Sequence, residues 1–132
     1  MTDKNDLLQT GIFKMDQQHK EIFLVAQSLS DAFQTLQTKE ALLPICNRLF
    51  NVCRQHFDEE ERLMLKFFYP HTEAHIGLHM DHTIILANLI NNIKSDAYSD
   101  AMDTLAYLIK WHEDHISDAD QHYADYISPR SL

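Results

Sequence analysis

The sequence predicts an all-α protein in which an antiparallel, up-down-up-down four-helix bundle follows an irregular N-terminal arm. Apolar residues recur at spacings of three and four along nearly the whole chain, as expected for helices with one buried face. The period-two alternation typical of half-buried strands is absent from the sequence. The 132 residues include only two Gly and three Pro, too few for the many turns of a sandwich or barrel.

The first two helices follow from the apolar stripes in the first half of the chain. After an arm over residues 1–15, a helix is expected at about 16–37, where one face carries Ile22, Ala26, Leu29, Phe33 and Leu36. The second helix is expected at about 42–67, and its stripe contains Ile45, Leu49, Val52, Cys53, Leu63 and Phe67. We expect Pro44 in the first turn of this helix, where its missing N–H breaks no hydrogen bond.

The last two helices are separated from the rest by breaks at Pro70 and around residues 95–99. The third is expected at about 71–94, with Leu86, Leu89 and Ile93 on its inner face. The fourth is expected at about 98–127, with an inner face that carries Ala101, Leu105, Leu108 and Tyr123. Because short connections make consecutive helices antiparallel, we expect a single domain over residues 1–132.

Charge and hydropathy exclude several classes of function. Eleven Lys and Arg against twenty Asp and Glu give a formal charge of −9, which repels nucleic-acid phosphates. No apolar run is long enough to predict a membrane span, and the N-terminus lacks a secretory signal, which favours a cytoplasmic location. Cys46 and Cys53 lie two helical turns apart, about 10 Å along the axis. That separation is too long for a disulfide, so both are expected in the core.

Histidine is the unusual component of this composition, with nine copies, and it is the commonest metal ligand in proteins. The inward stripes of all four helices contain histidine, in the set His19, His56, His75, His79, His82, His112 and His115. Polar groups on a buried face are costly unless they are paired or bound to metal. A contribution from every helix therefore indicates a metal site in the bundle interior.

The order of these residues along the chain indicates that they meet at one end of the bundle. His19 and the pair His75 and His79 lie near the starts of the first and third helices. His56, Glu60 and His115 lie in the later parts of the second and fourth helices, which run in the opposite direction. So many imidazoles and carboxylates exceed the needs of one zinc ion, and they suit two iron-like ions that share bridging carboxylates.

Four segments carry a resemblance to a known family: MDQQHKEIF around His19, HFDEEERLM from His56, YPHTEAHIGLH up to His79, and WHEDHISDADQHY around His115. From Ile12 to Tyr123 the chain resembles the hemerythrins, specifically their single-domain bacterial members. The resemblance implies one iron held by His75, His79 and His115. It implies a second iron held by His19 and His56, with Glu60 and Asp120 bridging both ions.

The family likeness also implies a function. It predicts a non-haem di-iron protein that binds dioxygen reversibly at the open position of the His19 and His56 iron. Storage, delivery to an oxygen-using partner enzyme and sensing are the roles compatible with this chemistry, and a monomer is expected. One alternative is a di-iron oxidase or peroxidase with the same centre, and another is a regulatory module that responds to iron or redox state.

The spacing of the last two ligands requires an irregular helix. His115 and Asp120 are five residues apart, which on a regular helix places them about 140° apart around the axis. Both reach one site if a π-bulge lies between them, a feature that recurs at functional sites. In a regular helix Asp118 would be the competing ligand, and we follow the family pattern in choosing Asp120.

The sequence departs from the family at two positions of the oxygen pocket. His112 replaces a usual Leu and His82 replaces a frequent aromatic residue, whereas Phe57, Trp111 and Tyr123 retain the rest of the pocket wall. The two imidazoles either face the pocket, as hydrogen-bond or proton donors, or lie at the periphery against Asp81 or Glu113. His71 and His122 are expected at the surface, and of the acidic run at 58–61 only Glu60 is expected to point inward.

Overall fold

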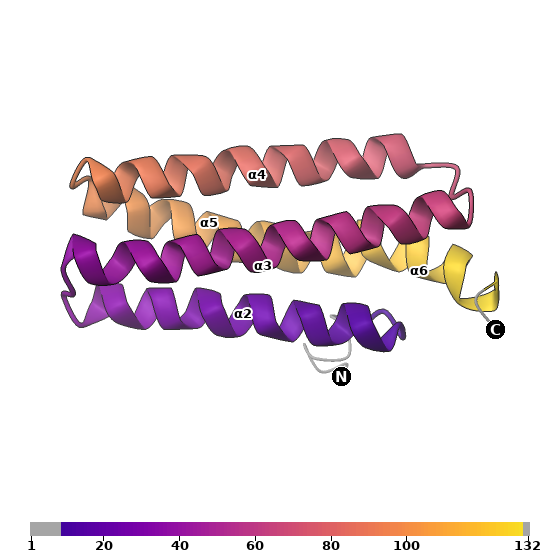
Figure 1. Cartoon of the computed structure of the whole chain (residues 1–132), viewed down its shortest axis with the longest axis horizontal. Helices are drawn as coiled ribbons and strands as arrows, with labels where there is room; N and C mark the ends of the chain where they lie inside the picture. Colours follow the sequence, from indigo (N-terminus) through magenta and orange to yellow (C-terminus); the bar gives the residue numbers. More distant parts are fainter. Residues whose placement is uncertain (1–8, 131–132) are drawn as a thin grey trace.

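Four long helices lie side by side and antiparallel, which confirms the predicted all-α bundle (Figure 1). The structure is a computed structural model that describes residues 9–130. Its helices are α2 (Phe13–Gln34), α3 (Lys39–Lys66), α4 (Thr72–Lys94) and α5 (Tyr98–His115). A π-helical turn, η1 (Ile116–Asp120), continues α5 into α6 (Gln121–Ile127), and the 3-10 turn η2 (Ser128–Arg130) follows. No helix within the described residues is long and apolar enough to cross a membrane.

Two helices begin three residues earlier than predicted. The α2 helix begins at Phe13 rather than 16, because the Asp16 carboxylate accepts hydrogen bonds from the backbone N–H groups of Thr10 and Gly11, 2.7 and 3.1 Å away. These contacts fix the chain just before the helix, so the part of the predicted arm over residues 13–15 is helical. Residues 1–8 of that arm lie outside the described part of the chain.

The α3 helix begins at Lys39 rather than 42, because the Thr38 hydroxyl caps it by accepting a hydrogen bond from the Ala41 N–H. The expected place of Pro44 in the first turn is therefore wrong, since Pro44 lies inside α3. The helix continues through it without the one hydrogen bond that a proline cannot donate.

The first three long helices end in the same way, on a residue with left-handed backbone. The φ angles are 56° at Leu36, 55° at Phe68 and 63° at Asp96. In each case the next N–H bonds back into the last turn, as Gln37 does to the Ala32 carbonyl at 3.1 Å. Glycine is the usual residue at such a position, and none of the three is glycine.

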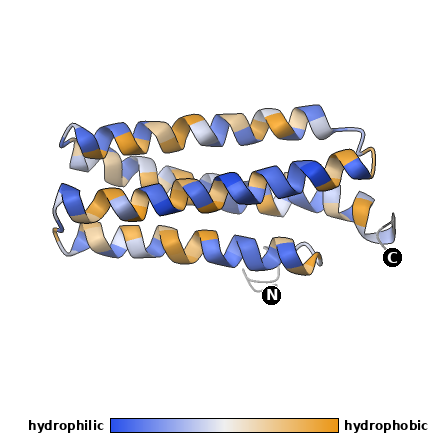
Figure 2. Ribbon diagram, in the orientation of Figure 1, coloured by the Kyte–Doolittle hydropathy of each residue, from blue (hydrophilic) through white to orange (hydrophobic). Residues whose placement is uncertain are grey.

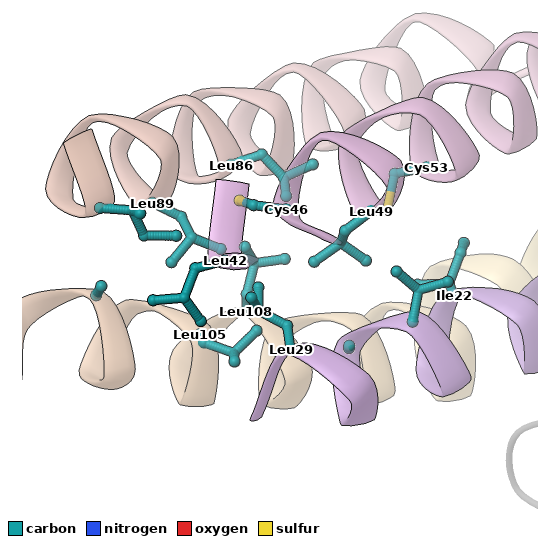
Figure 3. Packing of buried hydrophobic residues seen from close by; sticks show 14 of the residues in the cluster. Ile22, Leu29, Leu42, Cys46, Leu49, Cys53, Leu86, Leu89, Leu105 and Leu108 are labelled. Carbon is teal, nitrogen blue, oxygen red and sulfur yellow. The ribbon is translucent and has the colours of Figure 1, made fainter. Parts of the chain in front are cut away.

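Apolar side chains gather in two separate clusters along the bundle. The larger one fills the interior near the α2–α3 and α4–α5 connections, where Leu29, Leu89 and Ile93 are fully buried (Figure 3). Figure 2 shows the matching orange residues on the helices, with hydrophilic residues over much of the outer surface. The smaller cluster lies towards the chain ends of the bundle and contains Met15, Met64, Tyr69, Tyr123 and Ile127.

Cys46 and Cys53 are free and buried in the larger cluster, as predicted (Figure 3). Burial raises the pKa of the Cys46 thiol to about 12 and raises that of Cys53 as well. Both thiols therefore remain protonated near neutral pH, and they act as small apolar core groups.

Candidate metal centre

A layer of buried polar side chains separates the two apolar clusters. On α2, for example, His19 stands between Met15 of the smaller cluster and Ile22 of the larger one. The seven residues assigned to the metal site are each at most 6% exposed: His19, His56, Glu60, His75, His79, His115 and Asp120. The structure therefore brings together the six side chains that the sequence stripes directed inward and Asp120, which the family resemblance added.

These seven side chains form two overlapping groups. The first consists of His75, His79 and His115 with the two carboxylates Glu60 and Asp120. The second consists of His19 and His56 with the same two carboxylates. Within each group the potential ligand atoms lie within 4.8 Å of one another, so each group has the size of a single-ion site. Glu60 and Asp120 belong to both groups and are placed to bridge them.

The π-helical turn at Ile116–Asp120 confirms the bulge that the spacing of the last two ligands required. The wider turn brings Asp120 onto the same side as His115, whose Nε2 lies 3.0 Å from Asp120 Oδ1. The Asp118 side chain, the alternative in a regular helix, is 80% exposed and lies 3.6 Å from His122. The extra residue in this turn therefore determines which aspartate enters the interior.

Distances between the facing atoms fit ligands of a common ion. His19 Nε2 and His56 Nε2 are 3.0 Å apart, and His75 Nε2 is 2.7 Å from Glu60 Oε1 and 3.0 Å from Asp120 Oδ1. Ligands at right angles on an octahedral ion, with bonds of about 2.1 Å, lie about 3.0 Å apart. Tetrahedral ligands at that bond length lie about 3.4 Å apart. Two further contacts, His56 Nε2 to Glu60 Oε2 and His19 Nε2 to Asp120 Oδ2, are 3.2 and 3.3 Å long. The spacing therefore suits ligands of a small cation and does not select one coordination geometry.

Several of these atoms lie close together without forming hydrogen bonds. His79 Nε2 is 3.0 Å from a Glu60 oxygen and His115 Nε2 is 3.0 Å from an Asp120 oxygen, yet neither nitrogen has a hydrogen-bond partner. Both oxygens of Asp120 are also without one. Buried polar atoms are rarely left unsatisfied. The orphaned atoms are aimed at the space between them, as metal ligands are, and the donor set therefore fits a bound metal.

The buried carboxylates and histidines stabilise one another's charged forms even without a metal. Burial alone would raise the pKa of Glu60, but close contact with the imidazoles of His56, His75 and His79 outweighs it and holds that pKa well below its usual range. The pKa of Asp120 is also lowered: burial and the charge of Glu60 would both raise it, but contact with His115, His19 and His75 outweighs these effects. Although burial opposes it, contact with the two carboxylates raises the pKa of His75 to about 9. Both carboxylates are therefore ionised at neutral pH and ready to bind a cation.

Two residues that contact the histidines from outside were not predicted from the sequence. Gln18 Oε1 lies 2.7 Å from His56 Nδ1, and Glu61 Oε2 lies 2.8 Å from His79 Nδ1. The expectation that only Glu60 of the acidic run points inward is thus wrong for Glu61, whose side chain is 24% exposed. The one feature of the sequence that could have indicated them is their position: Gln18 directly precedes His19, and Glu61 directly follows Glu60.

Of the predicted pocket residues, His112 and Phe57 contact the two-histidine group, and Trp111 and His82 contact His112 from the other side. His112 lies next to His19 and His56, with ring centroids 5.9 and 6.4 Å away. Phe57 stacks on His79 at 4.0 Å, and Trp111 stacks on His115 at 4.7 Å. Tyr123 instead belongs to the smaller apolar cluster and faces His75 at 5.4 Å.

His82 and His112 are interior residues, so the peripheral alternative against Asp81 or Glu113 is wrong. Their exposed fractions are 0% and 1%, their rings are 5.3 Å apart, and none of their ring nitrogens has a hydrogen-bond partner in the described structure. Burial lowers the pKa of His82 to about 3 and that of His112 well below its usual value. Both are therefore neutral imidazoles at pH 7. His71 and His122 are exposed, as predicted.

A helical bundle with a buried layer of histidines and carboxylates defines a class of metal-binding proteins. Residues 10–127 match the hemerythrin HHE cation binding domain. The chain belongs to the hemerythrin family.

Named relatives cover most of the chain. The bacteriohemerythrins of Stenotrophomonas maltophilia (strain R551-3) and Pseudomonas aeruginosa (strain LESB58) are each 31% identical to it over 123 residues, which are 92% of this chain and 78% of the relative. A bacteriohemerythrin of Campylobacter jejuni (strain 81-176) is 28% identical over 79 residues, 60% of this chain and 59% of its own. No solved structure matches the chain.

Proposed function

We propose that the chain binds two iron ions and, through them, dioxygen reversibly. The observation that carries this proposal is the unequal pair of ligand groups, three histidines in one and two in the other, around the shared carboxylates Glu60 and Asp120. An octahedral ion with two histidines and two bridging carboxylates has coordination positions left for an external ligand. Membership of the hemerythrin family supports iron as the metal.

Some side chains of the site would bind the metal, and others would exclude water from it. Glu60 and Asp120 supply two negative charges that offset part of the charge of two cations, and the five histidines complete the ligand set. When bound, two ferrous ions supply the electrons with which dioxygen is taken up, and they recover those electrons on release. Reversible uptake needs a site closed to water, because protons and water promote loss of bound oxygen as peroxide.

The wall beside the two-histidine group provides that protection. The ring of Phe57 lies 5.7 Å from that of His56, and the rings of Phe23 and Trp111 lie 5.5 and 6.1 Å from that of His112. His112 and His82 are neutral, so each has one N–H to donate and carries no proton to release at pH 7. Hydrogen bonding to a bound ligand therefore fits these two residues better than proton delivery does.

The proposal is tested by loading metal-free protein anaerobically with ferrous iron and admitting oxygen. We expect two irons per chain and a visible absorption band that appears with oxygen and disappears when oxygen is removed, over several cycles. Fewer than two irons, or a band that decays irreversibly in the first cycle, would contradict reversible binding. Storage, delivery to an oxygen-using enzyme and sensing all depend on the same reversible step.

A second candidate, an oxidase or peroxidase built on the same centre, is favoured by one observation only. The imidazole of His112 lies beside His19 and His56, and that of His82 lies behind it at 5.3 Å, at positions where the family usually has apolar groups. An oxidase would release hydrogen peroxide continuously when a reductant is supplied. Peroxide production measured during turnover with a reductant distinguishes the two, and we expect it to be slow compared with oxygen release.

A further inference from the structure

The two groups of histidines have different supports on their outer sides. Glu60 and Asp120 belong to both groups, so they do not make one metal position stronger than the other. Any difference in affinity therefore comes from the number of histidines and from the partners of their outer ring nitrogens. A partner that accepts the outer N–H fixes the tautomer and raises the basicity of the imidazole, and its loss typically costs 10–100-fold in metal affinity.

The three-histidine group has a carboxylate as an outer partner. Glu61 Oε2 lies 2.8 Å from His79 Nδ1, which accordingly donates its proton outward and directs Nε2 towards Glu60, 3.0 Å away. The charge of the carboxylate makes the imidazole a stronger ligand than a neutral partner would. This group therefore combines a third histidine with an anionic support.

The two-histidine group has only a neutral support. Gln18 Oε1 lies 2.7 Å from His56 Nδ1, and the Gln18 amide NH₂ donates to Glu59. Glu59 is itself held by Lys14, whose Nζ lies 3.2 Å from the other carboxylate oxygen. Because Glu59 accepts from the amide nitrogen, the amide oxygen must face His56. Gln18 is therefore fixed as an acceptor, and His56 Nε2 is left free to bind metal.

The other histidine of this group has no outer support at all. His19 Nδ1 is buried and has no hydrogen-bond partner in the described structure. An imidazole without an outer acceptor is less basic and less firmly oriented. The differences in ligand number, outer charge and outer hydrogen bonding therefore all weaken the same metal position.

We propose that the centre fills in a fixed order, with the His75, His79 and His115 position first and the His19 and His56 position second. Gln18 acts as a positioning residue that orients His56 while keeping this second position the weaker one. This inference rests on the proposed two-ion centre. Since the second position is the one with room for oxygen, oxygen binding would begin only above one iron per chain and would follow the iron supply steeply.

Anaerobic titration of the metal-free protein with Co²⁺, followed by calorimetry and visible absorption, tests the order. We expect two steps of one ion each, with Kd values at least tenfold apart, and different visible spectra for the first and second ion. A single step that takes up both ions with one Kd would overturn the proposal.

Exchanging the amide and the carboxylate tests the role of Gln18. The double substitution Gln18→Glu with Glu59→Gln preserves the net charge and the hydrogen-bonded pair, but it places the carboxylate against His56. We expect a 10–100-fold lower Kd for the second step alone. Glu59→Gln by itself is the matched control and should leave that step without such tightening. Glu61→Gln should raise the Kd of the first step 10–100-fold.

Equal shifts of both steps in either variant would show a general change in folding, and they would contradict separate control of the two positions. Circular dichroism of each metal-free variant shows whether the bundle is intact before metal is added. The inference and the proposed function fail differently. Two equal sites that bind oxygen reversibly would overturn the order alone, whereas ordered sites without reversible oxygen binding would overturn the function alone.

Discussion

His112 is the residue through which this chain differs most directly from a purely apolar oxygen pocket. Its ring borders both His19 and His56, and among residues 9–130 its nitrogens have no hydrogen-bond partner. Its N–H is therefore available to whatever occupies the second position. In the proposed oxygen complex, such a bond would stabilise the bound ligand but also peroxide as it leaves, and the balance between these effects would determine how long the oxygenated form survives.

Replacing this group with an apolar one, in His112→Leu, should slow the autoxidation of the oxygenated protein. A hydrogen bond of about 1.4 kcal/mol to the departing group corresponds to a rate change of about tenfold. The measurement is the first-order decay of the visible band in air. His71→Leu, which alters an exposed histidine far from this wall, is the control. An unchanged decay rate in His112→Leu would remove His112 from the mechanism.

His82 should also affect the pH dependence of folding. Its pKa is lowered to about 3 in the native state, mainly by burial, from a usual value of 6.5. Between those values the unfolded chain binds a proton that the native chain does not, so stability decreases as pH falls from 6.5 towards 3. One such proton contributes about 1.4 kcal/mol per pH unit to the free energy of unfolding.

The variant His82→Phe should therefore lose less stability in acid than the wild type. We expect the slope of unfolding free energy against pH to be smaller by up to about 1.4 kcal/mol per unit between pH 6 and 4. Urea unfolding of both metal-free proteins at several pH values measures it. His75 has the opposite sign, since its raised pKa favours the protonated native state, but it is common to both proteins and cancels in the comparison. Parallel slopes would show that His82 is hydrated in the native state.

At the scale of the helices, periodicity alone predicted the number of elements and their inward faces. The ends were less predictable, because they depend on single contacts such as those of Asp16 with Thr10 and Gly11. For the site, helical spacing directed six of the ligands inward, whereas Asp120 was chosen over Asp118 on the family resemblance, which required the irregular turn between His115 and Asp120. Gln18 and Glu61 were missed because contacts between different helices leave no periodic signal in one chain.

The left-handed residue that ends α2 offers a way to stabilise the bundle. Leu36 has φ 56° and its side chain is 90% exposed, so it bears backbone strain while burying little apolar surface. Leu36→Gly should raise the free energy of unfolding by about 0.5–1 kcal/mol, because glycine adopts this conformation without strain. Leu24→Gly is the matched control at an exposed position inside the same helix. It should instead lower stability by about 1 kcal/mol in the same denaturation experiment.

In the molecule as a whole, the polar layer divides the core into parts of unequal strength. The larger cluster extends over all four long helices and needs no metal to hold it together. The smaller cluster has five buried members, Met15, Met64, Tyr69, Tyr123 and Ile127, and the polar layer lies between it and the larger cluster. Without metal, that layer consists of ionised carboxylates and histidines with several unsatisfied atoms. Bound metal should therefore stabilise the small cluster selectively.

Hydrogen exchange with and without metal tests this coupling. Ions present at 100 times their Kd contribute about 2.7 kcal/mol, or about 100-fold in the population of any open state that releases them. We expect metal removal to accelerate exchange by about that factor at amides around Met64 and Tyr123, where opening breaks the layer. Amides around Leu89 and Ile93, in the larger cluster, should change much less. Equal acceleration at both places would mean that the bundle opens as one unit and that the layer does not divide it.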